Sequence, residues 1–323
     1  MNRRRWLLSV SVLLSALQAH AQGTRPKNRI GWLSPVEAEP ANTLDIFRTK
    51  FRELGHVEGR DFAIESRHAD GRPERLPGLA RELVAMKPAV ILTFSSAAVA
   101  ALQKATASIP VVFGSAGNPD ELGFVKSLAR PGGNITGASL RIATNGKLLD
   151  LIRDCLPGAR RIVILEHETD LVAKRNADRF LRDVANTRYE ASVVWVKDAE
   201  GLERAIAEAA ARKAEAVIVP TLSMFAMQSA KFGELALKTR LPVFTHIRQI
   251  AVNGGLLSYT PDISENFRRA AILVDKILRG ANPGDLPVEQ PDRYVLTVNL
   301  RTAKALGITI APAVVLRADE VIE

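Results

Sequence analysis

Short apolar runs alternate with amphipathic stretches along the first half of the chain. The stretches repeat apolar residues every three or four positions, which is typical of helices that cover a sheet. The pattern predicts strands at 29–34, 62–68, 89–94 and 110–115, and helices at 42–54, 76–86, 97–107 and 120–129. Four strand-and-helix units in succession indicate a parallel sheet with helices on both faces.

The same alternation begins again after the apolar segment 135–140. It predicts helices at 147–155, 170–186, 202–213 and 223–238, strands at 161–165, 192–196, 216–219 and 242–245, a turn and strand over 253–260, and a helix at 264–279. The last helix is extra to the second sheet. We therefore expect the chain to cross back to the first domain at this point.

These elements predict an α/β protein of two doubly wound parallel-sheet lobes joined by a multi-strand hinge. We expect the N-terminal lobe to comprise residues 27–138 and 258–285, and the C-terminal lobe to comprise residues 139–257 and 286–323. Lobes joined by several crossing segments can rotate against each other with little strain inside either core, and small ligands bind in the clefts between such lobes.

Residues 1–21 have the pattern of a secretory signal peptide. Three arginines at positions 3–5 precede the apolar run 6–17, and the small residues Ala19 and Ala21 mark an exit site. The run is shorter than the roughly 20 residues that span a bilayer. We expect cleavage near Ala21 and no membrane span in the mature chain, with the general secretory and twin-arginine routes both open.

The net charge of the 323-residue chain is +9, with 47% hydrophobic and 24% charged residues. The signal segment holds three arginines and no acidic residue, so its removal lowers the net charge to +6. The remaining lysines and arginines are dispersed among acidic residues, and aromatic residues make up only 5% of the chain. This pattern argues against nucleic-acid binding.

No catalytic or metal-binding motif occurs in the sequence. The chain lacks the glycine-rich loop of phosphate-binding proteins and the glycine spacing of a nucleophile elbow. The histidines at 56, 68, 167 and 246 have no metal-ligand spacing to one another or to Cys or acidic residues. Cys155, the single cysteine, is expected to be a small buried apolar residue. We therefore expect a binding protein rather than an enzyme, with no metal and no cofactor.

Polar residues follow several predicted strands at the point where each strand ends. Ligands of open parallel sheets bind beyond these carboxyl ends, where helix starts present free N–H groups. The candidate ligand-binding residues are Ser34, Ser95, Ser96, Ser115, Asn118, Glu166, Thr221, His246 and Tyr259. Ser95 and Ser96 are the best candidates for holding a carboxylate. Helix capping alone is an equal alternative for Ser96 and for Asn118, which precedes Pro119 and Glu121.

Longer motifs resemble those of a known family. They are FRELGHVEGR at 51–60, SLARPGGNITG at 127–137, VDKILRG at 274–280, LPVEQP at 286–291 and RADEVIE at 317–323. In this order they resemble the substrate-binding proteins of bacterial ABC importers of the tryptophan/tyrosine-binding type. The resemblance covers nearly the whole mature chain and implies the type I periplasmic binding fold.

The candidate site departs from that family pattern at three places. Family members commonly have Gly-Thr after the third strand, Asp-Pro after the fourth and Asn-Pro where the second lobe begins. This chain has Ser95-Ser96, Asn118-Pro119 and Glu166-His167. Asn118 lacks the charge that would pair with a ligand ammonium, and an uncompensated buried charge costs several kcal/mol. Glu166, from the opposite lobe, is the candidate to supply it.

The resemblance predicts the extracytoplasmic solute-binding component of an ABC importer. It would capture a small organic ligand, with aromatic and apolar amino acids as candidates, and the ligand would stabilise a closed form of the two lobes. We expect a periplasmic location, an ABC permease of the inner membrane as partner, and a monomer. A periplasmic sensor that reports to a membrane receptor kinase is the alternative.

Overall fold

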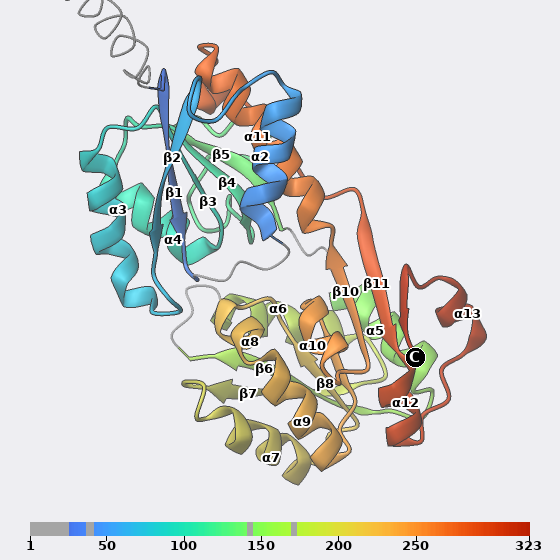
Figure 1. The fold of residues 1–323 in the computed structure, drawn as a ribbon. Helices are drawn as coiled ribbons and strands as arrows, with labels where there is room; N and C mark the ends of the chain where they lie inside the picture. The colour runs from blue at the N-terminus through green and yellow to red at the C-terminus, as the bar shows by residue number, and fades with distance from the viewer. Residues whose placement is uncertain (1–25, 37–41, 141–144, 169–172) are drawn as a thin grey trace, which may run out of the picture.

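The computed structural model describes residues 26–36, 42–140, 145–168 and 173–323, and the predicted signal peptide lies outside these ranges. The chain forms two α/β lobes, one above the other in Figure 1. The first contains β1 (Asn28–Ser34), α2 (Thr43–Glu53), β2 (Phe62–His68), η2 (Pro73–Arg75), α3 (Leu76–Ala85), β3 (Val90–Thr93), α4 (Ser96–Ala105), β4 (Val111–Ala116), β5 (Ile135–Ser139), α11 (Ile263–Leu278) and η3 (Pro283–Asp285).

The second lobe follows β5 and ends with the chain. It contains α5 (Asn145–Cys155), β6 (Arg161–His167), α6 (Ala173–Ala185), β7 (Glu190–Val196), α7 (Leu202–Ala211), β8 (Ala216–Val219), α8 (Ser223–Met227), α9 (Ser229–Thr239), β9 (Val243–Thr245), α10 (Arg248–Val252), β10 (Leu257–Pro261), β11 (Tyr294–Asn299), α12 (Leu300–Leu306), α13 (Pro312–Leu316) and β12 (Glu320–Ile322).

The first sheet has the strand order β2-β1-β3-β4-β5, with every pair parallel. Helices α3 and α4 pack on one face, and α2 and α11 pack on the other, so apolar side chains fill a layer on each side. The buried strands are accordingly apolar runs without strict alternation, as parallel sheets covered on both faces require.

Helix α11 is held to the first lobe by a charged contact as well as by its apolar face. Asp275 accepts a hydrogen bond from His56 Nε2 at 2.7 Å and from Arg279 Nε at 2.8 Å. The His56 ring stacks on Phe51 of α2 with 4.0 Å between ring centroids. Burial raises the pKa of Asp275, but the hydrogen bonds outweigh it and hold this pKa below its ordinary value.

The second sheet has the order β12-β11-β10-β9-β8-β6-β7, and β11 is antiparallel to β10 while the other pairs are parallel. One face packs against α5, α6, α12 and α13, and the other against α7 to α10. The predicted class of two parallel-sheet α/β lobes is confirmed, with the antiparallel strand as an addition.

The chain passes between the lobes in different places from those expected. Residues 258–261, expected in the first lobe, instead belong to β10 and pair with β9 and β11. Residues 286–289, expected in the second lobe, lie against β5: Thr136 donates to the Leu286 carbonyl at 2.8 Å, and Glu289 N donates to the Gly137 carbonyl at 2.9 Å. The lobe to which these residues belong is determined by the strands with which they pair. The hydropathy pattern does not specify those partner strands.

The helix expected at 120–129 does not form. These residues make successive turns, with Gly123 at a φ of 72° and the Phe124 amide donating to the Pro119 carbonyl at 2.9 Å. Phe124 and Val125 are nevertheless buried in the cluster that contains α4. The apolar pattern therefore predicted the burial of these side chains correctly. The left-handed conformation of Gly123 is incompatible with a continuous helix.

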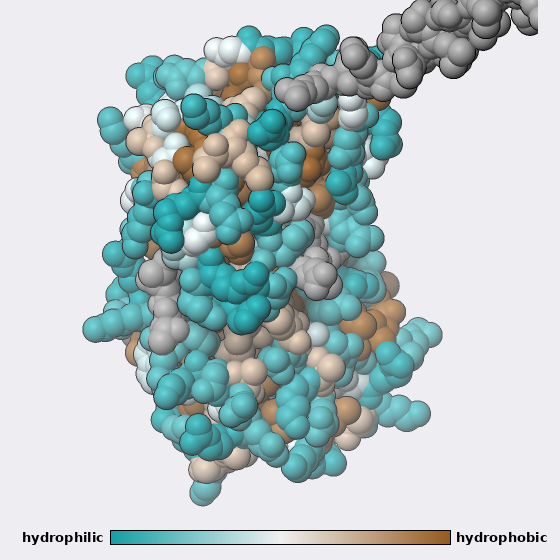
Figure 2. All heavy atoms as spheres, turned by 60° about the vertical axis from the view of Figure 1, so that its left-hand side comes forward, coloured by the Kyte–Doolittle hydropathy of each residue, from teal (hydrophilic) through white to brown (hydrophobic). Residues whose placement is uncertain are grey.

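Polar residues cover most of the face drawn in Figure 2, and hydrophobic residues occur there in small separate groups. Among the described residues, the large hydrophobic side chains with the greatest exposure are Val57, Leu181, Trp195, Met227, Leu237 and Leu316. Within the same ranges, no helix combines the length and the apolar character needed to cross a membrane.

Candidate functional site

Serines stand at the carboxyl ends of neighbouring strands in the first lobe. Ser34 ends β1 and is fully buried; its hydroxyl donates to the Val36 carbonyl and accepts from the Val36 amide at 3.2 Å. Ser95 follows β3, and its amide donates to the carbonyl of Ser115 in β4 at 2.7 Å. Because β1, β3 and β4 are parallel neighbours, the predicted serines gather at one edge of the sheet.

The start of α4 differs from the expectation by one residue. Ser95, rather than Ser96, is the N-cap, and its hydroxyl accepts from the Ala98 amide at 3.3 Å. Ser96 instead accepts from the Gly117 amide at 3.3 Å and so fastens the segment after β4. Ser95 has a φ of 72°, a left-handed conformation that is uncommon for serine. Strained backbone of this kind is often retained at functional sites.

Asn118 contacts the second lobe. It has a φ of 38°, and no helix follows it, so the expected capping role is wrong. With its amide oxygen turned toward α6, Asn118 accepts from both Nη1 and Nη2 of Arg179 at 2.9 Å. Arg179 also pairs with the Glu121 carboxylate, and Arg175 Nη1 donates to the Glu121 carbonyl. The loop after β4 is therefore bound to α6 of the second lobe.

A second contact joins the lobes elsewhere. Gly71, in the turn after β2, lies so close to Met227 of α8 that a Cβ atom at this glycine would stand 2.5 Å from the methionine Cε. The turn thus contacts the Met227 side chain of the second lobe. Together with the Arg179 contacts, it shows that the two lobes lie against each other in this structure.

The second sheet presents a buried polar group at the ends of β6, β8 and β9. Glu166 lies in β6 and is fully buried. Thr221, after β8, donates its hydroxyl to the His246 carbonyl at 3.2 Å. His246 follows β9, is 3% exposed, and has its Nδ1 2.7 Å from the Tyr259 carbonyl. Burial lowers the pKa of His246 to about 4 against the opposing hydrogen bond to Tyr259, so the ring is neutral at pH 7.

Tyr259 reaches this group through its backbone rather than its ring. The ring stacks on Tyr294 with 5.0 Å between centroids and packs against the cluster of α5, α12 and α13. Burial raises its pKa, and the charge of Asp319 adds to that effect. Tyr259 therefore contacts His246 through its carbonyl, while its side chain packs against the core of the second lobe.

Several polar residues on the loop after β4, on α6 and on β10 were missed by the sequence reasoning. Oδ1 of Asp120 and Oγ of Ser258 are shielded from solvent and have no hydrogen-bond partner among the described residues. Arg175 and Arg179 were also missed. Arg175 and Arg179 are four residues apart, which puts both side chains on one face of a helix. This spacing was the sequence signal that could have identified them. Asp120 directly follows Asn118-Pro119, so it brings a carboxylate close to the position where the family commonly has one.

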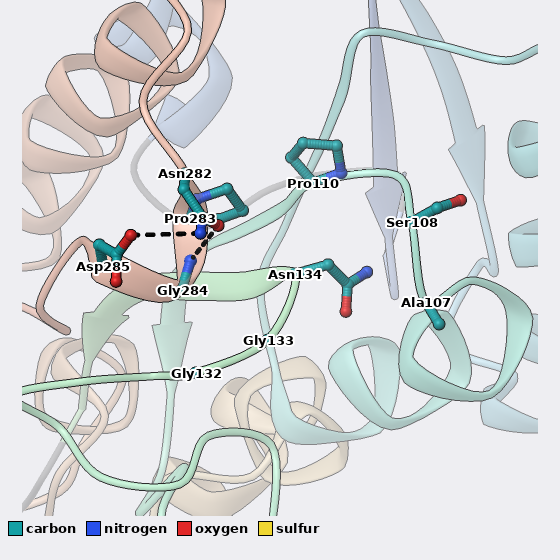
Figure 3. Close-up of a pocket in the computed structure, with 10 residues that line it drawn as sticks. All are labelled: Ala107, Ser108, Pro110, Gly132, Gly133, Asn134, Asn282, Pro283, Gly284 and Asp285. Atoms are coloured by element: carbon teal, nitrogen blue, oxygen red, sulfur yellow. Dashed lines mark hydrogen bonds between the residues drawn. The ribbon is translucent and has the colours of Figure 1, made fainter.

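The surface cavities lie elsewhere. One of about 510 Å³, drawn in Figure 3, is lined by residues 107–110, 132–134 and 282–285. In it Asn282 donates to Asp285 at 3.2 Å and accepts from the Gly284 amide at 3.0 Å. The first two of these segments precede β4 and β5, at the amino ends of the strands, and the third contains η3. Another, of about 420 Å³, lies beside residues 155–159 and 307–309. Neither coincides with the candidate site.

Cys155 is buried, as the sequence predicts, and burial raises the pKa of its thiol to about 12. A thiol with so high a pKa is a poor nucleophile and a poor metal ligand at neutral pH. Across the described ranges, no group of three or more His, Cys, Asp or Glu side chains has the arrangement of a metal site.

Comparisons with known proteins agree with the motifs. The model of the family described as ABC transporter substrate binding protein matches residues 42–322. A tyrosine-binding protein of Clostridioides difficile (strain R20291) is 24% identical over 262 residues, which cover 81% of this chain and 75% of that one.

Solved structures match over nearly the full chain. An ABC domain in complex with L-Trp from Streptococcus pneumoniae has a TM-score of 0.84 at 22% identity, over 93% of this chain and 100% of that one. The ligand-free, open structure of a substrate binding protein with adhesive properties from Clostridium difficile has a TM-score of 0.69 at 22% identity, over 92% and 99%. The predicted type I periplasmic fold is confirmed. Because the family model spans most of its length, this chain belongs to the ABC transporter substrate binding protein family.

Proposed function

We propose that this chain is the exported ligand-capturing component of an ABC importer and that it binds an aromatic amino acid between its lobes. The observation that carries the proposal is the direct contact of the lobes through Glu121, Asn118 and Arg179, at the edge where the polar strand ends of the first sheet gather. The ligands of the two similar proteins, tyrosine and L-Trp, favour this ligand class.

The mechanism is a shift from an open to a closed form. A ligand that touches both lobes binds the closed form more tightly, and this difference drives closure. The segments that cross between the lobes between β10 and α11 and before β11 would act in the hinge. Serines 34, 95, 96 and 115 would contribute from the first lobe, and Glu166, Thr221, His246 and Tyr259 from the second.

Asp120 is the proposed partner of the ligand ammonium group. Its shielded Oδ1 lacks a hydrogen-bond partner among the described residues, and it stands in the loop that contacts α6. A buried carboxylate oxygen without a donor is costly unless a cation pairs with it. Asp120 therefore fills the role left open by Asn118, and it does so from the same loop.

The proposed biological setting is supported by the signal-peptide pattern of residues 1–21 and by the family. The mature chain would begin at Gln22, reside in the periplasm as a monomer, and deliver its ligand to a permease in the inner membrane. Recognition of the closed form by the permease would couple ligand capture to transport.

The test is a binding screen of the mature chain by thermal shift and isothermal titration calorimetry against the amino acids and small organic acids, with native mass spectrometry of freshly purified protein. We expect an aromatic amino acid to bind. Asp120→Asn should weaken its binding more than tenfold, whereas Asp292→Asn, at an exposed carboxylate far along the chain, should not. Absence of any ligand in all three measurements would refute the proposal.

A further inference from the structure

The tautomer of His246 is fixed by its neighbour. Its Nδ1 lies 2.7 Å from the Tyr259 carbonyl oxygen, which can only accept a hydrogen bond, so Nδ1 must carry the proton. The pairing of β9 with β10 ends at the level of Thr245 and Ser258, and the His246 ring satisfies the next carbonyl along β10. This local need for a donor explains why a histidine follows the strand here.

The other ring nitrogen is then a hydrogen-bond acceptor. A neutral imidazole protonated at Nδ1 has a lone pair at Nε2. Nε2 of His246 is shielded from solvent and finds no donor among the described residues, and the nearby Ser258 hydroxyl is in the same situation. Buried polar atoms of native proteins are nearly always paired, so an unpaired acceptor at a strand end calls for a donor from outside the chain.

The acceptor is also held in place on several sides. The His246 amide donates to the Val219 carbonyl at 3.2 Å, and its own carbonyl accepts from Thr221 at 3.2 Å. With Nδ1 bound to Tyr259, the ring has little freedom to turn its Nε2 elsewhere. A group fixed in this way can discriminate between ligands, because it cannot move to avoid an unsuitable one.

We infer that His246 determines ligand specificity by accepting, at Nε2, an N–H or O–H donor carried on the side chain of the bound amino acid. This inference rests on the proposed function and narrows its ligand class to rings that bear a donor, such as a phenol or an indole. A phenyl ring would leave Nε2 buried and unpaired, which we expect to weaken binding by about 10- to 100-fold.

The experiment compares L-tyrosine, L-tryptophan, L-phenylalanine and O-methyl-L-tyrosine by calorimetry on the mature chain. His246→Asn keeps a donor near the Nδ1 position but removes the Nε2 acceptor, so the preference for tyrosine or tryptophan over phenylalanine should fall to within about twofold. His246→Gln places an amide oxygen near Nε2 and should restore part of it. The control is His68→Asn, another histidine whose ring contacts a carbonyl at a strand end, and it should keep the full preference.

A second measurement does not depend on the variants folding. Nitrogen-15 NMR of the wild-type chain, labelled at histidine, should show His246 as the neutral Nδ1–H tautomer at pH 7 and should show its Nε2 resonance shift when L-tyrosine or L-tryptophan is added. An Nε2–H tautomer, or an Nε2 resonance indifferent to ligand, would overturn the inference.

The outcomes separate this inference from the proposed function. Binding of the amino acids with a tyrosine-to-phenylalanine ratio unchanged in His246→Asn refutes the role of His246 and leaves the function standing. An equal loss for all four ligands would assign the hydrogen bond to the ammonium group and refute the side-chain assignment. Failure of every amino acid to bind would refute the proposed function and this inference together.

Discussion

The pair formed by Glu121 and Arg179 allows a direct test of lobe closure. Arg179→Met keeps the apolar stem of the side chain but removes the guanidinium that pairs with the Glu121 carboxylate and donates to the Asn118 amide oxygen. Both interactions join the lobes and form only when the lobes lie together. The substitution should therefore destabilise the closed form while leaving the core of each lobe intact.

The expected loss of affinity can be estimated from the solvent exposure of the two charged side chains. The side chains of Arg179 and Glu121 are 28% and 37% exposed, and a pair of this kind contributes about 0.5–1 kcal/mol. The charged hydrogen bond to the buried Asn118 adds about 1.5 kcal/mol. A total near 2 kcal/mol corresponds to roughly a 30-fold loss of affinity for a ligand that binds the closed form. Glu121→Gln removes the ion pair alone and should cost about 2- to 5-fold.

The assay combines calorimetry with small-angle scattering. Arg179→Met should weaken binding of the amino acid found by the screen, and at a ligand concentration that just saturates the wild type it should have a larger radius of gyration than the wild type. High salt should reduce the difference between wild type and Glu121→Gln, because exposed charges are screened. The matched control is Glu203→Gln, which removes an exposed pair with Lys238 inside the second lobe. Unchanged affinity and an unchanged radius in Arg179→Met would refute the role assigned to this contact.

Further expected outcomes concern stability and reactivity. Gly233→Ala should lower the free energy of unfolding by about 2–3 kcal/mol, because its Cβ would stand 1.6 Å from the Asn253 carbonyl oxygen, and calorimetric melting checks this; Gly78→Ala, where no atom lies within 4 Å, should stabilise by about 0.5 kcal/mol. The lowered pKa of Asp275 contributes stability at neutral pH that is lost as the pH falls through that pKa, so Asp275→Asn should cost about 1–2 kcal/mol at pH 7 and progressively less below pH 4 in urea titrations. Cys155 should stay unlabelled by a thiol reagent until the chain unfolds; rapid labelling of the folded chain would contradict its burial.

Periodicity predicted the elements of this fold better than their partners. Apolar spacing identified the strands and helices of both lobes because each element buries a face of its own, and burial is a local property of the pattern. The pairing of β10 with β9 and β11 depends on which backbone edges meet, and no residue of 257–261 encodes that choice. The segment at 120–129 shows a second limit of periodicity. Its apolar positions correctly predict which side chains are buried, but the left-handed conformation of Gly123 prevents the helix that the same positions predict.

Sequence reasoning likewise identified some residues of the candidate site and missed others. The rule that ligands gather at the carboxyl ends of parallel strands selected Ser95, Ser115 and His246, because strand ends can be read along the chain. Arg179 was not selected because its partners, Asn118 and Glu121, are distant in sequence. Asp120 was not selected because only the folded chain shows that its Oδ1 is shielded from solvent and lacks a donor among the described residues. Asn118 was selected as a ligand-binding residue with helix capping as the alternative; no helix follows it, and its amide oxygen accepts from Arg179 of the other lobe.

Most of the motifs that identify the family pack the first lobe, and the motif at 317–323 contributes β12 of the second lobe. His56, from the motif at 51–60, bonds to Asp275, from the motif at 274–280, and Thr136, from the motif at 127–137, bonds to Leu286 at the start of the next. Residues 120, 179 and 246 lie outside every such motif. Family membership therefore follows from residues that pack the fold, whereas the residues that we propose to select the ligand are brought together only in the folded chain. The proposed ligand preference of this chain is therefore tested at His246 and Asp120 and not at the family motifs.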